Sequence, residues 1–143
     1  NIQLKLGDVL LTKDGTIGKV ALVDTLPGST TLNSGVFVLR PKNHGYDSAY
    51  LYCLLRSHAF QEFVSGLSAG STINHLYQKD LLTLSFLAPA SVEEQHAIST
   101  VVLDIEAELE ILEKRIATAI DMRLGIMQQL LTAGQILKPG SDA

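Results

Sequence analysis

Apolar residues follow two patterns along the chain, short runs in the first 88 residues and a helical stripe in the rest. Four of the short runs predict strands, because each is followed by turn residues or closed by a proline. They lie at residues 8–12 and 19–23, at 36–42, where Pro41 closes the run, and at 81–89, where Pro89 closes it. These runs predict a small globular head of the α/β (α+β) class with mixed β-strands.

The stretch YDSAYLYCLLRSHAFQEFVSGL, residues 46–67, predicts one helix because its apolar residues recur near a period of 3.6. Asp47 or Ser48 is the expected N-cap, and Gly66 is the expected stop. A polar loop, SAGSTINHLYQKD, follows the helix, and we expect a short turn in it at Gln78–Leu81.

The longest helical pattern begins after Pro89 and runs to about Leu131 without a clear helix breaker. Ser91 and Glu94 have the spacing of a capping box, with serine at the cap and glutamate three residues later. Some 40 helical residues span roughly 60 Å, which is longer than a head of this size is wide. Such a helix cannot bury its apolar residues on its own head.

Apolar residues in this helix recur in steps of four, three, four, three and four, which is the spacing of a coiled-coil stripe. The predicted pairing seam consists of Ile98, Val102, Ile105, Leu109, Leu112 and Ile116. After Ile116 the apolar positions shift to Ile120, Leu124, Met127 and Leu131, as in a stutter. We therefore expect the helix to form a coiled coil with a second copy of the chain or with a second helix.

Composition excludes several classes of protein. A hydrophobic share of 46% and a mean hydropathy of +0.23 are not those of a disordered chain. The apolar runs are all shorter than the roughly 18 residues that a membrane span requires. A single cysteine, Cys53, excludes an internal disulfide and suits a reducing compartment. We expect a cytoplasmic protein with no membrane partner.

Charge is distributed unevenly, although the chain as a whole carries a formal net charge of −4. Residues 1–88 hold seven Lys or Arg and six Asp or Glu, a balance of +1. Residues 89–143 hold four Lys or Arg and nine Asp or Glu, a balance of −5. Because the acidity belongs to the helix and tail, net charge does not argue against a nucleic-acid partner for the head.

Two loops of the head carry residue types that contact nucleic acids. Lys13, Thr16 and Lys19 crowd the loop DGTIGKV and its flanks, where they can reach backbone phosphates. The second loop offers types that contact both base edges and phosphates. Its residues are Ser71, Thr72, Asn74, His75, Gln78 and Lys79. The alternative for each loop is structural: a glycine-bearing hairpin turn for the first, and a solvated loop with Asn74 capping a short turn for the second.

The chain shows no pattern of a catalytic or metal site. In DGTIGKV the glycines Gly15 and Gly18 stand too close for a phosphate loop, and Val20 replaces the hydroxyl that would hold Mg²⁺. The four histidines form neither an i, i+4 pair nor a cluster with cysteine, which argues against a metal. A pairing of Cys53 with His58 is too weak a signal for a nucleophile. We expect no cofactor and no catalytic residue.

Four stretches together resemble the specificity subunit of type I restriction-modification systems. GDVLLTKDGTIGKVALV is similar to a strand–turn–strand in the later half of that family's target recognition domain. AGSTINHLYQKDLLTLSFLAP resembles the family's G-[ST]-x-[IV]-x-x-[LI] loop and the strand after it. PASVEEQHAIS is similar to its P-x-x-x-E-Q-x-x-I helix start, and RLGIMQQLLTAGQI to its helix end.

The resemblance implies a non-catalytic element that reads a half-site in double-stranded DNA. Its long helix would pack on an equivalent helix, as in a dimer, and dock methyltransferase (M) subunits, while the restriction/translocase (R) subunit joins the assembly. Residues 1–88 would be part of a recognition domain, residues 89–133 the spacer helix, and residues 134–143 a tail. The family usually has two recognition domains and two helices, so the chain is expected to be a C-terminal portion of a longer subunit.

The expected DNA contacts combine the resemblance with the two loops. They are Lys13, Thr16, Lys19, Ser71, Thr72, Asn74, His75 and Lys79. The lysines would contact phosphates, and Asn74 or His75 would read bases. The alternative function is a protein-interaction adaptor whose small α/β head binds protein and whose helix oligomerises.

Overall fold

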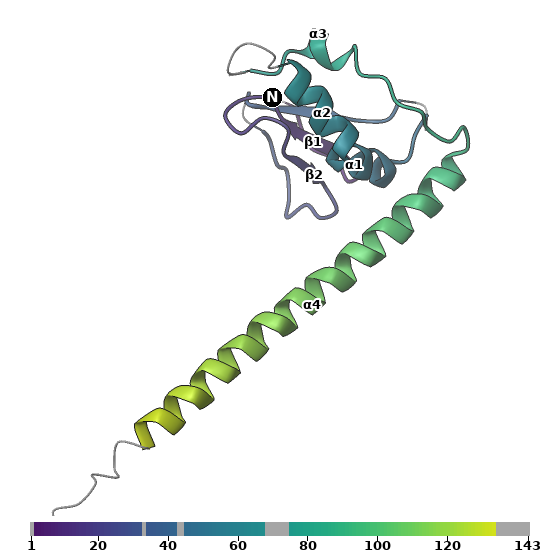
Figure 1. Cartoon of the computed structure of the whole chain (residues 1–143). Coiled ribbons are helices and arrows are strands. Elements are labelled where there is room, and N and C mark those ends of the chain that lie inside the picture. The colour runs from purple at the N-terminus through teal and green to yellow at the C-terminus, as the bar shows by residue number, and fades with distance from the viewer. Residues whose placement is uncertain (1, 33, 43–44, 68–74, 134–143) are drawn as a thin grey trace, which may run out of the picture. The chain divides into compact units, whose positions relative to one another are not determined.

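The computed structural model describes residues 2–32, 34–42, 45–67 and 75–133 (Figure 1). The chain divides into two compact units, a head unit, Asn1–Leu103, and a helix unit, Asp104–Ala143. The long helix α4, Val92–Ala133, contributes about its first three turns to the head unit and the rest to the helix unit.

Three short antiparallel strands form the sheet of the head unit. They are β1, Val9–Thr12, β2, Val20–Leu22, and β3, Val36–Leu39, in the order β2-β1-β3. Leu10 of the central strand pairs with Ala21 on one side and with Val38 on the other. Val9 and Leu11 are buried and Leu10 and Thr12 are half-buried, as expected for side chains that point alternately to the two faces of a sheet.

The prediction of a fourth strand at residues 81–89 is wrong. Its first residue, Leu81, ends the short helix α3, Gln78–Leu81, and no strand forms among the described residues 82–89. Leu84 and Phe86 nevertheless pack against the core, while Leu87 is fully exposed. The apolar run that resembled a strand therefore contributes side-chain packing, without backbone pairing to a neighbouring strand among the described residues.

The single helix predicted at residues 46–67 is two helices, α1, Ser48–Arg56, and α2, His58–Leu67. Ser57 between them has an extended backbone, and its hydroxyl accepts a hydrogen bond from the Phe60 amide at 3.4 Å. Serine competes for backbone groups in this way and favours helix starts over helix interiors. Asp47 is confirmed as the α1 cap, whereas Gly66 lies inside α2, which ends at the next residue.

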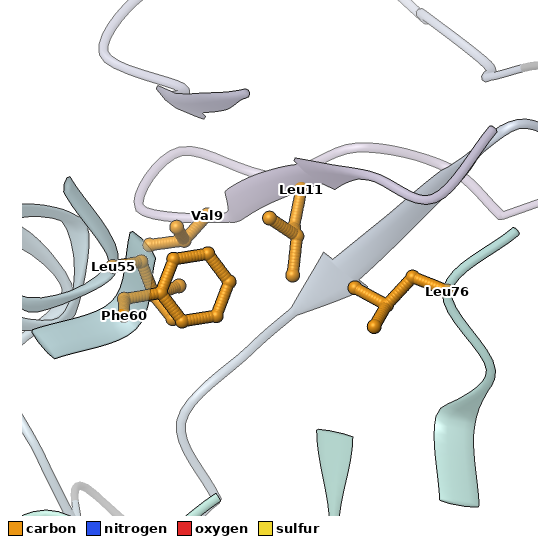
Figure 2. Close-up of a cluster of buried hydrophobic side chains, with 5 residues drawn as sticks. All are labelled: Val9, Leu11, Leu55, Phe60 and Leu76. Atoms are coloured by element: carbon orange, nitrogen blue, oxygen red, sulfur yellow. The ribbon is translucent and has the colours of Figure 1, made fainter. Parts of the chain in front are cut away.

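The core of the head unit joins the sheet to α1, α2 and the segment before α3. Its buried side chains are Val9, Leu11, Leu55, Phe60 and Leu76, shown together in Figure 2. Burying an aliphatic or phenyl side chain of this size stabilises a fold by about 1.5–3 kcal/mol. The core therefore depends on a residue, Leu76, that lies far along the chain from the strands it covers.

A buried carboxylate ties the start of β1 to the end of β3. Asp8 is only 1% exposed, and its two oxygens lie 2.6 Å and 2.7 Å from Nε and Nη2 of Arg40. The amide of Lys5 donates to the same carboxylate at 2.7 Å. Burial alone would raise the pKa of Asp8, but the hydrogen bonds from Arg40 and Lys5 and their charges lower it below its usual value.

The helix α4 begins as the capping spacing predicted. The Ser91 hydroxyl accepts a hydrogen bond from the Glu94 amide at 3.4 Å and donates to the Glu93 carboxylate at 2.5 Å. The helix has 42 residues and is therefore about 63 Å long. Across the part of the chain that the structure describes, no helix is long and apolar enough to span a membrane.

Candidate nucleic-acid interface and helix-pairing seam

The turn after β1 and the segment before α3 meet in the head unit, although 61 residues separate them in sequence. Asp14 and His75 form an isolated antiparallel bridge, and the Leu76 amide donates to the Lys13 carbonyl oxygen at 2.8 Å. The Asp14 carboxylate also pairs with Nδ1 of His75. Because Leu76 is buried in the core, its packing holds the His75 segment against the turn.

The turn between β1 and β2 owes its shape to Thr12 and two glycines. The Thr12 hydroxyl donates to the Thr16 carbonyl oxygen at 2.5 Å and accepts from the Lys19 amide at 3.0 Å. Gly15 and Gly18 have φ angles of +68° and +85°, a left-handed conformation that side chains disfavour. The backbone of this loop is therefore the glycine-bearing hairpin turn given above as the structural alternative. Thr16 and Lys19 are exposed on this turn.

Aromatic rings accompany the candidate cations. The amino group of Lys79 lies 5.4 Å from the centre of the Tyr77 ring, and that of Lys13 lies 5.2 Å from the centre of the Phe37 ring. The His75 and Tyr77 rings lie 4.5 Å apart between centres, at 59°. Tyr77 is 54% exposed, so this ring is available to a partner.

We call the group Lys13, Asp14, His75, Tyr77 and Lys79 the loop surface. It unites three of the predicted DNA-contact residues, Lys13, His75 and Lys79, through contacts that they and their neighbours make. Sequence reasoning missed Asp14 and Tyr77. The only local signal for Tyr77 was its position between a histidine and a lysine, and Asp14 carried none beyond its place in the turn.

The remaining predicted contacts separate into two groups. Thr16 and Lys19 lie on the β1–β2 turn, held by Thr12 rather than by the 75–79 segment. Ser71, Thr72 and Asn74 lie outside the described residues. Among those described, no group of three or more His, Cys, Asp or Glu side chains is placed to hold a metal ion.

An open groove of about 630 Å³ borders the loop surface. Lys13 and Gln78 lie at its polar side, and Phe37 of β3 with Leu81 and Leu82 form apolar walls. Arg40, at the end of β3, does not add to the positive charge here because its guanidinium is bound to Asp8.

The predicted pairing seam lies along α4, and every one of its residues is exposed. The exposed fractions are 40% for Ile98, 36% for Val102, 53% for Ile105, 53% for Leu109, 43% for Leu112 and 60% for Ile116. A run of large apolar side chains left open in this way is typical of a surface that another chain or helix covers.

A second apolar row lies beside the seam in the later part of α4. It consists of Ile111, Met122, Ile126 and Leu130, all between 57% and 68% exposed. At 100° per residue, Ile111 and Met122 lie about 120–140° around the helix from Ile98, outside the seam. Beyond Ile111 the apolar side chains therefore occupy more than one face of the helix, as in a bundle of more than two helices.

Comparison with known proteins places these features in one family. The model of the type I restriction modification DNA specificity domain matches residues 1–121. The type I restriction enzyme MjaIX specificity subunit of Methanocaldococcus jannaschii is 36% identical over 95 residues, which are 66% of this chain and 21% of the relative. The putative type I restriction enzyme MjaX specificity subunit of the same organism is 28% identical over 137 residues, 92% of this chain and 32% of the relative.

The chain thus spans about a fifth to a third of the length of the curated relatives that it matches. The family match extends from the strands of the head through the loop surface and the whole of the seam. The chain belongs to the family of type I restriction-modification DNA specificity domains.

Proposed function

We propose that this chain is a non-catalytic specificity element of a type I restriction-modification complex. Its head reads one half-site of double-stranded DNA, and catalysis resides in partner subunits. The observation that carries the proposal is the meeting of the Lys13–Asp14 turn with the His75–Lys79 segment, which gathers cations, an imidazole and an aromatic ring on one loop surface.

The residues of the loop surface have different roles in this proposal. Lys13 and Lys79, together with Lys19 and Thr16 on the neighbouring turn, contact phosphates, which positions the head on the duplex. His75 reads a base, as does Asn74 beside it. The loop positions Ser71 and Thr72 complete the contacts with base edges and phosphates.

Asp14 determines how His75 presents its ring. Since the Asp14 carboxylate faces Nδ1 of His75, Nδ1 is the nitrogen that donates to it, and Nε2 is the acceptor that the neutral form of the ring offers to a base. An acceptor at this position matches the amino groups of cytosine or adenine in the major groove.

The helix α4 supplies spacing and assembly. Pairing along the seam with a second helix, or with a second copy in a dimer, holds two heads at one separation and so fixes the gap between two half-sites. The second row, Ile111, Met122, Ile126 and Leu130, provides a further face on which methyltransferase (M) subunits dock. The restriction/translocase (R) subunit joins the assembly through these partners.

The experiment uses the intact specificity subunit with its methyltransferase partner. Methylation-site mapping identifies the bipartite target, and titration of that duplex gives the salt dependence of binding. Lys79→Ala should weaken binding to all sequences alike and lower the slope of log K against log salt by about 0.9, the value for one phosphate contact. His75→Ala should relax the preference at one base pair of the half-site, a discrimination of about 1–3 kcal/mol.

Lys114→Ala is the matched control, because this lysine lies in the helix unit and pairs with Glu110 at 2.6 Å. It should leave both the slope and the base preference unchanged. An affinity of the wild-type complex that does not fall between about 50 and 200 mM salt would rule out a phosphate-contacting head.

One observation favours the alternative, a protein-interaction adaptor. The head has exposed apolar side chains near the groove, such as Ile2, 58% exposed, and Leu82, 77% exposed. Leu82→Asp separates the two functions, since an adaptor would lose its protein partner while a DNA-reading head would keep its affinity for duplex.

A further inference from the structure

A polar cluster with two buried members joins the start of α1 to the first turns of α4 within the head unit. We call Asp47, Gln95, His96 and Ser99 the polar joint. Asp47 caps α1 with Oδ1, which lies 2.7 Å from the Tyr50 amide, and the same oxygen lies 3.1 Å from the Ser99 hydroxyl. Its other oxygen faces Nδ1 of His96 at 3.2 Å.

Gln95 uses both ends of its amide in the joint. Its Oε1 accepts from the Asp47 amide at 2.9 Å, and its Nε2 donates to the Pro89 carbonyl oxygen at 2.8 Å. One side chain thus connects α1, the segment before α4 and α4 itself. The two bonds require a donor and an acceptor on one planar group, which only an amide of this length supplies.

Two side chains of the joint, Gln95 and Ser99, are buried although they are polar. Gln95 is 4% exposed and Ser99 is fully buried, and both have hydrogen-bond partners. Capping of α1 needs only Asp47 and the Tyr50 amide, and α4 is capped by Ser91. The contacts that Gln95 and Ser99 make with Asp47 are therefore not needed to cap either helix, whereas a satisfied network of this kind fixes one arrangement of the groups that it joins.

Because α4 is long, a small change in its tilt at the joint produces a large displacement of its other end. For a rigid helix of about 63 Å, a tilt of about 3° at the start moves the other end by about 3.3 Å. That displacement is close to the rise of one base pair along a DNA strand, about 3.4 Å. Hydrogen bonds at the start of α4 can therefore decide the spacing to within one base pair.

We propose that the polar joint is a positioning element that sets the gap between the two DNA half-sites, with Gln95 and Ser99 as its determining residues. This inference rests on the proposed function, because a gap exists only if two heads read two half-sites. Gln95 and Ser99 act through α4 and touch neither DNA nor the reacting groups.

The test measures methylation by the intact specificity subunit and its methyltransferase on duplexes whose half-sites are separated by gaps varied one base pair at a time. Gln95→Glu keeps the shape of the side chain but removes the donor to Pro89 and places a second carboxylate beside Asp47. Ser99→Ala removes only the hydroxyl. Methylation at gaps one base pair off the optimum should rise roughly fivefold relative to the optimum, the effect of one lost hydrogen bond.

Thr100→Ala is the matched control. Like Ser99, Thr100 has its hydroxyl near the His96 carbonyl oxygen, at 2.9 Å compared with 3.0 Å, but Thr100 is exposed and Ser99 is the one that reaches Asp47. Thr100→Ala should keep the wild-type gap profile. Thermal unfolding of each complex shows whether the variant is folded. If Gln95→Glu is not folded, the gap profile of Ser99→Ala is the test of the inference.

The outcomes separate the positioning role from the others. Folded Ser99→Ala with the wild-type gap profile, or with methylation lowered equally at every gap, would overturn the inference, since a merely structural residue behaves in that way. A wild-type complex that methylates no bipartite site would instead overturn the proposed function itself.

Discussion

The head unit and the helix unit differ in whether their apolar side chains are buried. In the head, side chains from β1, α1, α2 and the segment before α3 bury one another, and five of them are at most 2% exposed. In the helix unit, residues 107–132 are all exposed, including isoleucines, leucines and methionines. The head is therefore stabilised by contacts within the chain, whereas residues 107–132 leave their apolar side chains open to a partner such as the one proposed above.

This difference separates two kinds of mutational effect. Truncating a core side chain lowers the free energy of unfolding of the head at any protein concentration. Changing a seam residue alters an association equilibrium, whose effect depends on the concentration of the partner. Variants in the two units should accordingly be told apart by the dependence of their stability on concentration.

The largest expected effect is in the head. Leu76→Ala should lower the free energy of unfolding of the head by about 3 kcal/mol, because it leaves a cavity beside Leu11. Leu87→Ala is the matched control: the same chemical change at a fully exposed leucine in the same stretch should cost less than about 0.5 kcal/mol. Urea titration followed by tyrosine fluorescence gives both values, and equal losses would contradict the core described in Figure 2.

The next effect is in the helix. Glutamates at Ile105 and Leu112 should weaken helix pairing at least a hundredfold, about 2.7 kcal/mol, because each places a charge in the seam. Ala107→Glu is the control, since nine residues from Ile98 place it on the opposite side of the helix. Sedimentation velocity over a range of concentrations should show monomers for the double variant and wild-type association for the control. An unchanged oligomer would show that the seam residues do not pair. A lower free energy of unfolding of the head in the double variant would contradict the independence of the two units.

The parts that the sequence predicted well are those that local rules determine. The three strands, the Asp47 cap and the start of α4 at Ser91 follow from apolar runs and from capping residues. The length of α4 follows in the same way from the absence of a breaker before Ala133. The loop residues Lys13, His75 and Lys79 were predicted one by one as DNA contacts, from their types and the family resemblance.

The parts that were missed depend on contacts between distant residues. The failure of the fourth strand reflects side-chain packing against the core, which overrides the local pattern. The break at Ser57 is an exception, because the hydrogen bond from the Phe60 amide to the Ser57 hydroxyl is local. The pairing of Asp14 with His75 and the buried amide of Gln95 join residues 61 and 48 positions apart. No local periodicity encodes such partners, so a carboxylate and an amide read as ordinary surface residues in the sequence.

The smallest expected effect compares the acids of the two units. Asp8→Asn should lower the free energy of unfolding of the head by about 2 kcal/mol at neutral pH, because it weakens a buried charged contact, and the partly exposed Arg40 limits the loss. The pKa of Asp8 is lowered in the folded head, so its contribution is complete above the unfolded pKa of about 3.9. It is lost as the pH falls through the lower folded-state pKa.

The stabilities of wild type and Asp8→Asn should therefore begin to converge below about pH 3.9, as measured by urea titrations that extend from neutral pH into acid below that value. Glu110→Gln is the control in the helix unit. The Lys114 hydrogen bond lowers the pKa of Glu110 as well, yet both side chains are exposed and solvent screens their interaction. Glu110→Gln should leave the free energy of unfolding of the head unchanged at every pH. If the Asp8 difference persisted in acid, Asp8 would stabilise the head through its shape rather than its charge, and the contrast between a self-sufficient head and a partner-dependent helix would then depend on apolar burial alone.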